Sequence, residues 1–185
     1  KPDPVWEPLT HAFPLHFLRY HCGNEYDWKK VSGPVENREP IRAHYLPKMN
    51  PNPGLDEFLQ WRETLPGKPT VSLIASPLRP VEELAELVAY CNAKTGPMAE
   101  RRALVGHPEP YGVAVWELGN ETDWAKRKDL DIMRADTDKE KGDKITVEEY
   151  ADLCIKRIDA MRAVDPTIRI FAHAATGPWE KQNAK

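Results

Sequence analysis

The sequence lacks a long apolar run, a secretory leader pattern and a surplus of one charge. No stretch is apolar enough to cross a membrane, and no apolar core with basic flanks begins the chain. Its 26 basic and 29 acidic residues give a net charge of −3, so we expect neither a nucleic-acid nor a membrane partner. Because residue 1 is Lys rather than Met, a leader removed earlier stays open as an alternative.

Cysteine is also scarce. The chain has three, Cys22, Cys91 and Cys154, an odd number without the short spacings of a metal site. This pattern argues against a disulfide framework, and it favours free thiols in a reducing compartment such as the cytoplasm. Without metal-type spacings we expect no metal, and we also expect no cofactor.

The 185 residues, 41% of them hydrophobic, suit a single domain over residues 1–185 that buries its own core. The 18 prolines and 6 tryptophans indicate long ordered loops. Aromatic rings in such loops stack on sugar faces in many carbohydrate sites, and packing within the core or the loops is an equally good interpretation of them.

Strand and helix patterns alternate along the chain. β-branched and alternating apolar residues predict strands over residues 16–20, 69–75, 113–118 and 167–173. Apolar stripes predict helices over residues 55–65, after Pro80 and after Thr146, where Thr146 and Glu149 have the spacing of a capping box. This order builds a parallel α/β sheet. Four strands are half of a (β/α)8 barrel, so the chain is either a small open sheet or a partial barrel.

The most informative motif follows the third predicted strand. That strand stops at Gly119 and is followed by Asn120 and Glu121, at the end of the strand where βα folds carry their catalytic residues. A half-buried carboxyl group there suits general acid catalysis, and an amide beside it suits a sugar hydroxyl. Taken alone, the pair also fits a solvated turn.

Four segments together resemble the α-L-arabinofuranosidases of glycoside hydrolase family 51, which belong to a clan of retaining (β/α)8 glycosidases. They are LRYHCGN (18–24) with YDW (26–28), DEFLQW (56–61), VAYCN (88–92) leading to GHPEPYGV (106–113), and WELGNETD (116–123). The likeness continues through the predicted helix after Thr146. It implies that the chain is the N-terminal part of the catalytic barrel, about four βα units, and a piece of a longer polypeptide.

The resemblance also implies roles for single residues. Glu121 matches the general acid/base, Asn120 the amide that binds a hydroxyl beside the anomeric carbon, and Asn24 a further sugar contact. Trp28 and Trp124 follow loops on the substrate side and are candidates to stack on sugar, and packing within the loops is at least as good an interpretation of them. The family's nucleophile lies on a later strand that this chain does not reach, so we expect these 185 residues alone to lack it.

The expected function is therefore removal of terminal arabinofuranose from plant polysaccharides or oligosaccharides. The chain has His21 and Cys22 where the family usually has Pro and Gly, which makes the sugar less certain than the reaction. A clan member with another specificity, such as a β-xylosidase, and a catalytically incomplete sugar-binding piece remain the alternatives. Surfaces left open by a half barrel also predict a possible homo-oligomer.

Overall fold

A computed structural model gives the structure of the protein. The residues it describes, to which every structural statement below refers, are 12–13, 15–21, 27–38, 40–43, 46–49, 53–120, 122 and 146–173. The expected residues Glu121, Asn24 and Trp124 lie outside this described part of the chain.

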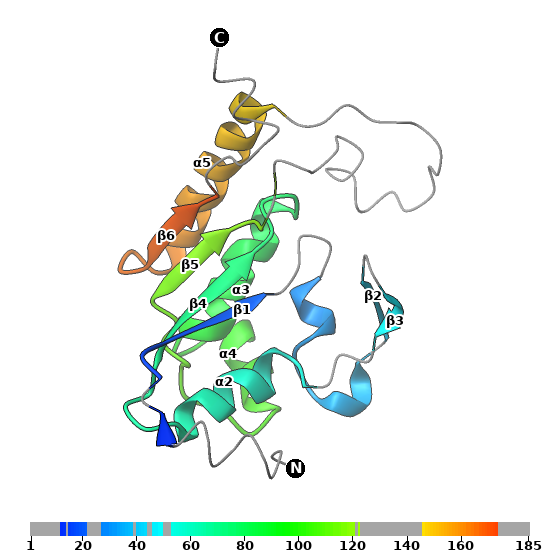
Figure 1. Ribbon diagram of the computed structural model, residues 1–185, viewed down its shortest axis with the longest axis vertical. Coiled ribbons are helices and arrows are strands. Elements are labelled where there is room, and N and C mark those ends of the chain that lie inside the picture. Colours follow the sequence, from blue (N-terminus) through cyan, green and yellow to red (C-terminus); the bar gives the residue numbers. More distant parts are fainter. Residues whose placement is uncertain are drawn as a thin grey trace.

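The centre of the fold is a four-stranded sheet in the order β1 (Phe17–His21), β4 (Thr70–Ala75), β5 (Val115–Leu118) and β6 (Arg169–Ala172). Every neighbouring pair is parallel. The four predicted strands and the α/β class are thus confirmed, with ends that differ by one or two residues. Because all strands run the same way, their carboxyl ends share one edge of the sheet (Figure 1).

The three predicted helices are confirmed as α2 (Leu55–Thr64), α3 (Val81–Asn92) and α5 (Val147–Val164). The capping box of α5 forms as expected: the Glu149 amide donates to Thr146 Oγ1 at 3.2 Å, and the Thr146 amide donates to Glu149 Oε2 at 2.8 Å. No helix in the described residues is long and apolar enough to cross a membrane.

Several short elements were not predicted. Helix α4 (Pro97–Ala103) follows Gly96, whose φ of 95° favours glycine. Between β1 and α2, the chain forms two 3₁₀ turns, η1 (Trp28–Lys30) and η2 (Val35–Asn37), and an antiparallel pair of strands, β2 (Ile41–Ala43) and β3 (Leu46–Met49). Elements of three to seven residues are too short to show a clear hydrophobic period.

The hydrophobic core lies between one face of the sheet and helices α2, α3 and α5. Strand residues Leu73, Trp116 and Leu118 are fully buried there and belong to the same cluster as Leu59 and Met161 of the helices. Alternate residues of each strand point to opposite faces, so the helix-covered face takes every second side chain. The remaining side chains project from the other face.

A buried carboxylate fixes the chain that follows β1. Asp56, at the start of α2, accepts hydrogen bonds from the amide of Gly33 at 2.7 Å and from the hydroxyls of Tyr90 at 2.7 Å and Tyr111 at 3.0 Å. The guanidinium of Arg38 lies 3.6 Å from the same carboxylate. A fully buried carboxylate is stable in a fold only with partners of this kind. Asp56 thereby ties the β1 to α2 connection to the core.

A buried cation fixes the connection from α3 to β5. Arg102 of α4 is fully buried, and its guanidinium donates to four backbone carbonyls, those of Tyr90, Ala93, His107 and Pro108, at 2.6–3.1 Å. These contacts satisfy loop carbonyls that would otherwise be buried without a donor.

We predict that Arg102→Ala lowers the free energy of unfolding by at least about 3 kcal/mol, because each buried carbonyl left without a donor costs about 1–3 kcal/mol. Urea unfolding measures the effect. Leu104→Ala is the control, since Leu104 is exposed two positions away and should change the free energy by less than about 0.5 kcal/mol. Equal unfolding midpoints for the two variants would contradict the structural role of Arg102.

Candidate functional site

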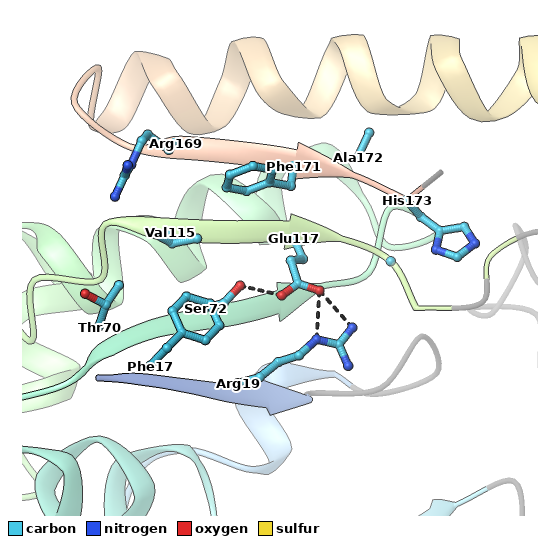
Figure 2. Close-up of a pocket in the computed structure, with 11 residues that line it drawn as sticks. Phe17, Arg19, Thr70, Ser72, Val115, Glu117, Arg169, Phe171, Ala172 and His173 are labelled. Atoms are coloured by element: carbon cyan, nitrogen blue, oxygen red, sulfur yellow. Dashed lines mark hydrogen bonds and ion pairs between the residues drawn. The ribbon is translucent and has the colours of Figure 1, made fainter. Parts of the chain in front are cut away.

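A cavity of about 600 Å³ lies on the face of the sheet that the helices leave uncovered. Alternate residues of all four strands line it (Figure 2). These are Phe17 and Arg19 of β1, Thr70 and Ser72 of β4, Val115 and Glu117 of β5, and Arg169 and Phe171 of β6. Ala172, the last residue of β6, also lines the cavity, and Gly119 and His173 extend the lining past the carboxyl ends of β5 and β6. The cavity therefore reaches the edge of the sheet where Asn120 lies.

Glu117 lies at the centre of a polar network on this face. Its Oε2 accepts a hydrogen bond from Arg19 Nε at 2.8 Å, and Arg19 Nη2 lies 2.8 Å from the same oxygen. Its Oε1 accepts a hydrogen bond from Ser72 Oγ at 2.5 Å. Figure 2 shows the carboxylate between these two partners, so that one side chain joins β5 to β4 and to β1.

The environment of Glu117 favours its ionised form. Desolvation raises its pKa, but the hydrogen bonds from Arg19 and Ser72 and the positive charge of Arg19, with a smaller electrostatic contribution from His21, together outweigh desolvation. The net effect is a pKa below the ordinary value of 4.5. Glu117 is thus a carboxylate at neutral pH, which suits it to hold a cation and not to donate a proton.

Asn120 is joined to this network through Arg19. The second edge of the guanidinium, at Nη2, donates to Asn120 Oδ1 at 3.1 Å. Arginine has only donors, so the atom of Asn120 that faces it must be the carbonyl oxygen. The NH₂ group of Asn120 is consequently turned away from Arg19.

The hydroxyl of Tyr150 joins the carboxyl ends of β5 and β6. It donates to the carbonyl of Leu118 at 2.6 Å and accepts from the amide of His173 at 2.7 Å. Burial raises the pKa of Tyr150, so the hydroxyl keeps its proton and its role as donor. Helix α5 thereby fixes the backbone two residues before Asn120.

Of the site residues expected from the sequence, the structure describes Asn120 and Trp28. Asn120 lies at the carboxyl edge of the sheet as expected. The roles of Glu121, Asn24 and Trp124 stay predictions. Residue His21 of β1 pairs with Ile74, and Leu118 of β5 pairs with Ala75, so the strands that precede Asn24 and Glu121 end at the same edge.

The burial of Trp28 contradicts the expectation that it stacks on a sugar. Its side chain is 3% exposed and belongs to the core cluster. The ring packs against Tyr90 at 5.1 Å between centroids and against the Arg101 guanidinium at 5.5 Å, and Nε1 donates to the carbonyl of Glu83 at 3.0 Å. An aromatic ring buried against α3 stabilises the fold more than an exposed ring would. Trp28 is therefore a packing residue.

Arg19, Ser72 and Glu117 were not predicted from the sequence as site residues. A signal for them was present: Arg19 and Glu117 are opposite charges inside two predicted strands, on the face opposite the apolar residues. The structure also places Cys91 and Cys154 as buried cysteines outside any disulfide. No group of three or more His, Cys, Asp or Glu side chains in the described ranges is arranged to hold a metal ion.

The arrangement of these groups, with Arg169 as a further cation in the lining, suits a ligand that is rich in hydrogen-bonding groups. Arg19, Ser72, Thr70 and the Asn120 amide supply donors and acceptors of hydrogen bonds, and the rings of Phe17 and Phe171 supply apolar surface. Among the described residues that line the cavity, Glu117 is the one carboxylate, and the Arg19 ion pair compensates its charge.

Comparison with known proteins points to one family. The sequence profile described as "Alpha-L-arabinofuranosidase 1 domain" matches residues 15–184. Among curated relatives, the intracellular exo-alpha-(1->5)-L-arabinofuranosidase 1 of Bacillus subtilis (strain 168) is 30% identical over 175 residues. That match covers 90% of this chain and 31% of the relative, so the chain spans about a third of the length of the curated relative.

Solved structures agree with this assignment. An alpha-L-arabinofuranosidase of Thermotoga maritima in complex with arabinose has a TM-score of 0.67 and 26% identity, covering 85% of this chain and 30% of that one. A family 51 enzyme from Bifidobacterium longum has a TM-score of 0.74 at 23% identity, covering 92% and 32%. Together with the four parallel strands and their helices, these matches confirm the expected partial (β/α)8 barrel.

We predict that Glu117→Gln flattens the acid limb of the stability curve. The folded-state pKa of Glu117 is lowered, so its contribution to stability is present above the unfolded value near 4.5 and is lost as the pH falls through the folded value. Urea unfolding between pH 7 and pH 3 should show a smaller acid loss in the variant than in the wild type.

Ser72→Ala removes one of the donors to the same carboxylate. Its loss of stability at acid pH should lie between those of the wild type and Glu117→Gln. Parallel curves for wild type and Glu117→Gln below pH 4.5 would contradict the lowered pKa.

Proposed function

Since this chain belongs to the alpha-L-arabinofuranosidase 1 domain family, we propose that it forms part of a retaining α-L-arabinofuranosidase with Glu121 as the general acid/base. One observation carries the proposal. The segment that matches the family's Asn-Glu pair leaves β5 at the carboxyl edge of the sheet, and Asn120 lies there beside a polar cavity. This is the edge at which (β/α)8 enzymes carry their catalytic groups.

In the proposed reaction, Glu121 gives its proton to the glycosidic oxygen as the bond to the anomeric carbon breaks. A second carboxylate attacks that carbon from the other face and forms a glycosyl-enzyme ester. Glu121, now ionised, removes a proton from water, which hydrolyses the ester and releases arabinose. Asn120 donates from its NH₂ group to the hydroxyl next to the anomeric carbon, and Asn24 adds a second contact to the sugar.

The attacking carboxylate is proposed to lie outside these 185 residues. A retaining mechanism needs two carboxyl groups about 5–5.5 Å apart, and Glu117 is already neutralised by Arg19. Exposed aromatic rings on the cavity face also support the proposal that part of the barrel lies outside these residues. Phe17 and Phe171 are 55% and 57% exposed on it, whereas parallel sheets normally have both faces covered. The remaining strands of a barrel would cover these rings.

We predict that Glu121→Ala, in the longest natural polypeptide that carries these residues, lowers turnover by about 10²–10⁴-fold on substrates with poor leaving groups. The loss should be much smaller on activated aryl glycosides, which need little protonation. Azide should partly restore the activated reaction, since it attacks the ester without losing a proton. Initial rates on a leaving-group series measure both effects. An equal loss on every substrate with no azide effect would contradict the role of Glu121.

We also predict that the isolated 185-residue chain does not release arabinose at an enzymatic rate, because the nucleophile is proposed to lie outside it. Exposed Phe17 and Phe171 should make it associate, which sedimentation velocity detects. The control is the longest natural polypeptide under the same assay. Robust arabinose release by a mass-verified monomer of 185 residues would contradict the prediction and would make Glu25 and Glu180 the first carboxylates to test.

A further inference from the structure

We propose that Glu117 is a positioning residue, whose carboxylate, held by Ser72, orients Arg19 so that Arg19 fixes the amide of Asn120. The inference rests on the proposed function, in which Asn120 binds the sugar, and it adds a group that does not itself touch substrate. It also assigns a purpose to the charged pair on the open face of the sheet.

The first step of this relay is the orientation of the carboxylate. Ser72 lies on β4, the strand between those that carry Glu117 and Arg19. Its hydroxyl holds Oε1 at 2.5 Å, which leaves Oε2 directed at the guanidinium of Arg19. Both carboxylate oxygens are therefore engaged, and the Glu117 side chain, 24% exposed, is restrained from two sides.

The second step is the orientation of the guanidinium. Contacts from Nε and from Nη2 to one carboxylate oxygen, each 2.8 Å long, fix the plane of a group that would otherwise rotate about its long side chain. Arg19 is 46% exposed at its side chain, so burial alone does not hold it. The carboxylate supplies the restraint.

The third step is the choice between two orientations of the amide. Arg19 Nη2 lies 3.1 Å from Asn120 Oδ1, and a flipped amide would place its own N–H donors against the donors of the guanidinium. The pair therefore selects the orientation in which Asn120 Nδ2 points away from Arg19. When the direction of a hydrogen-bond donor is fixed before the ligand binds, less of the binding free energy is lost to ordering that donor.

The test compares Glu117→Gln with wild type in the longest natural polypeptide, using 4-nitrophenyl α-L-arabinofuranoside and its 2-deoxy analogue. Without the charge, Glu117 no longer holds the Arg19 guanidinium against Asn120 Oδ1, and the amide loses this restraint on its direction. We expect kcat/KM on the arabinofuranoside to fall about 10- to 100-fold, mainly through kcat. On the 2-deoxy analogue, which lacks the hydroxyl that Asn120 binds, the loss should be less than about 3-fold.

Glu63→Gln is the matched control. Glu63 is also a carboxylate in a pair, 2.8 Å from His107 and 26% exposed, and it belongs to the last turn of α2, before the amino end of β4. Glu63→Gln should leave kcat/KM unchanged on both substrates. A general structural loss in Glu117→Gln would lower the rate on both substrates equally, and that result would overturn the inference. So would an unchanged rate on both.

Two further readouts separate this inference from its alternatives. Azide rescue of Glu117→Ala would identify Glu117 as the attacking nucleophile and would overturn a positioning role. In protein labelled with ¹⁵N-asparagine, the Asn120 side-chain signals should shift in Glu117→Gln and stay unchanged in Glu63→Gln. This second measurement needs no turnover, so an inactive wild type would refute the proposed function alone, whereas an unmoved Asn120 signal would refute the relay.

Discussion

The alternation of side chains along parallel strands is the constraint on which both the core and the site depend. One face of β1, β4, β5 and β6 packs on the helices and carries Leu73, Trp116 and Leu118. The other face carries Arg19, Ser72 and Glu117. A shift of one residue in any strand would exchange the two sets. The apolar packing behind the sheet therefore decides which charges meet in front of it.

Much of the fold could be predicted from local patterns. The strand that ends at Gly119 and the capping box at Thr146 are signals contained within a few residues, and both were predicted correctly. Helix α4 and the pair β2 and β3 were missed, because they hold three to seven residues each, too few to show a hydrophobic period.

Of the candidate site, only residues that belong to a recognisable sequence motif were predicted. Asn120 followed from the strand and from the resemblance. Arg19 and Glu117 could be seen only as single charges within two predicted strands, and their pairing across 98 positions depends on the order and register of the strands. Trp28 shows the opposite failure. Its place in a loop suggested a sugar contact, but its distance from Tyr90 and Glu83 along the sequence concealed the packing that buries it. Predicting the pairing of Arg19 with Glu117 requires the register of the sheet, and predicting the burial of Trp28 requires the position of the helices behind the sheet.

The Tyr150 hydroxyl has a consequence for how this protein can change over evolution. It holds Leu118 on one side of the β5 to α5 connection, while its own helix begins on the other side. The two ends of that connection are thus tied together independently of what lies between them. Since lengthening a loop with fixed ends costs little entropy, residues can be gained or lost there without displacing Asn120. The length of this connection is therefore free to diverge while the carboxyl end of β5 and the start of α5 keep their relative position.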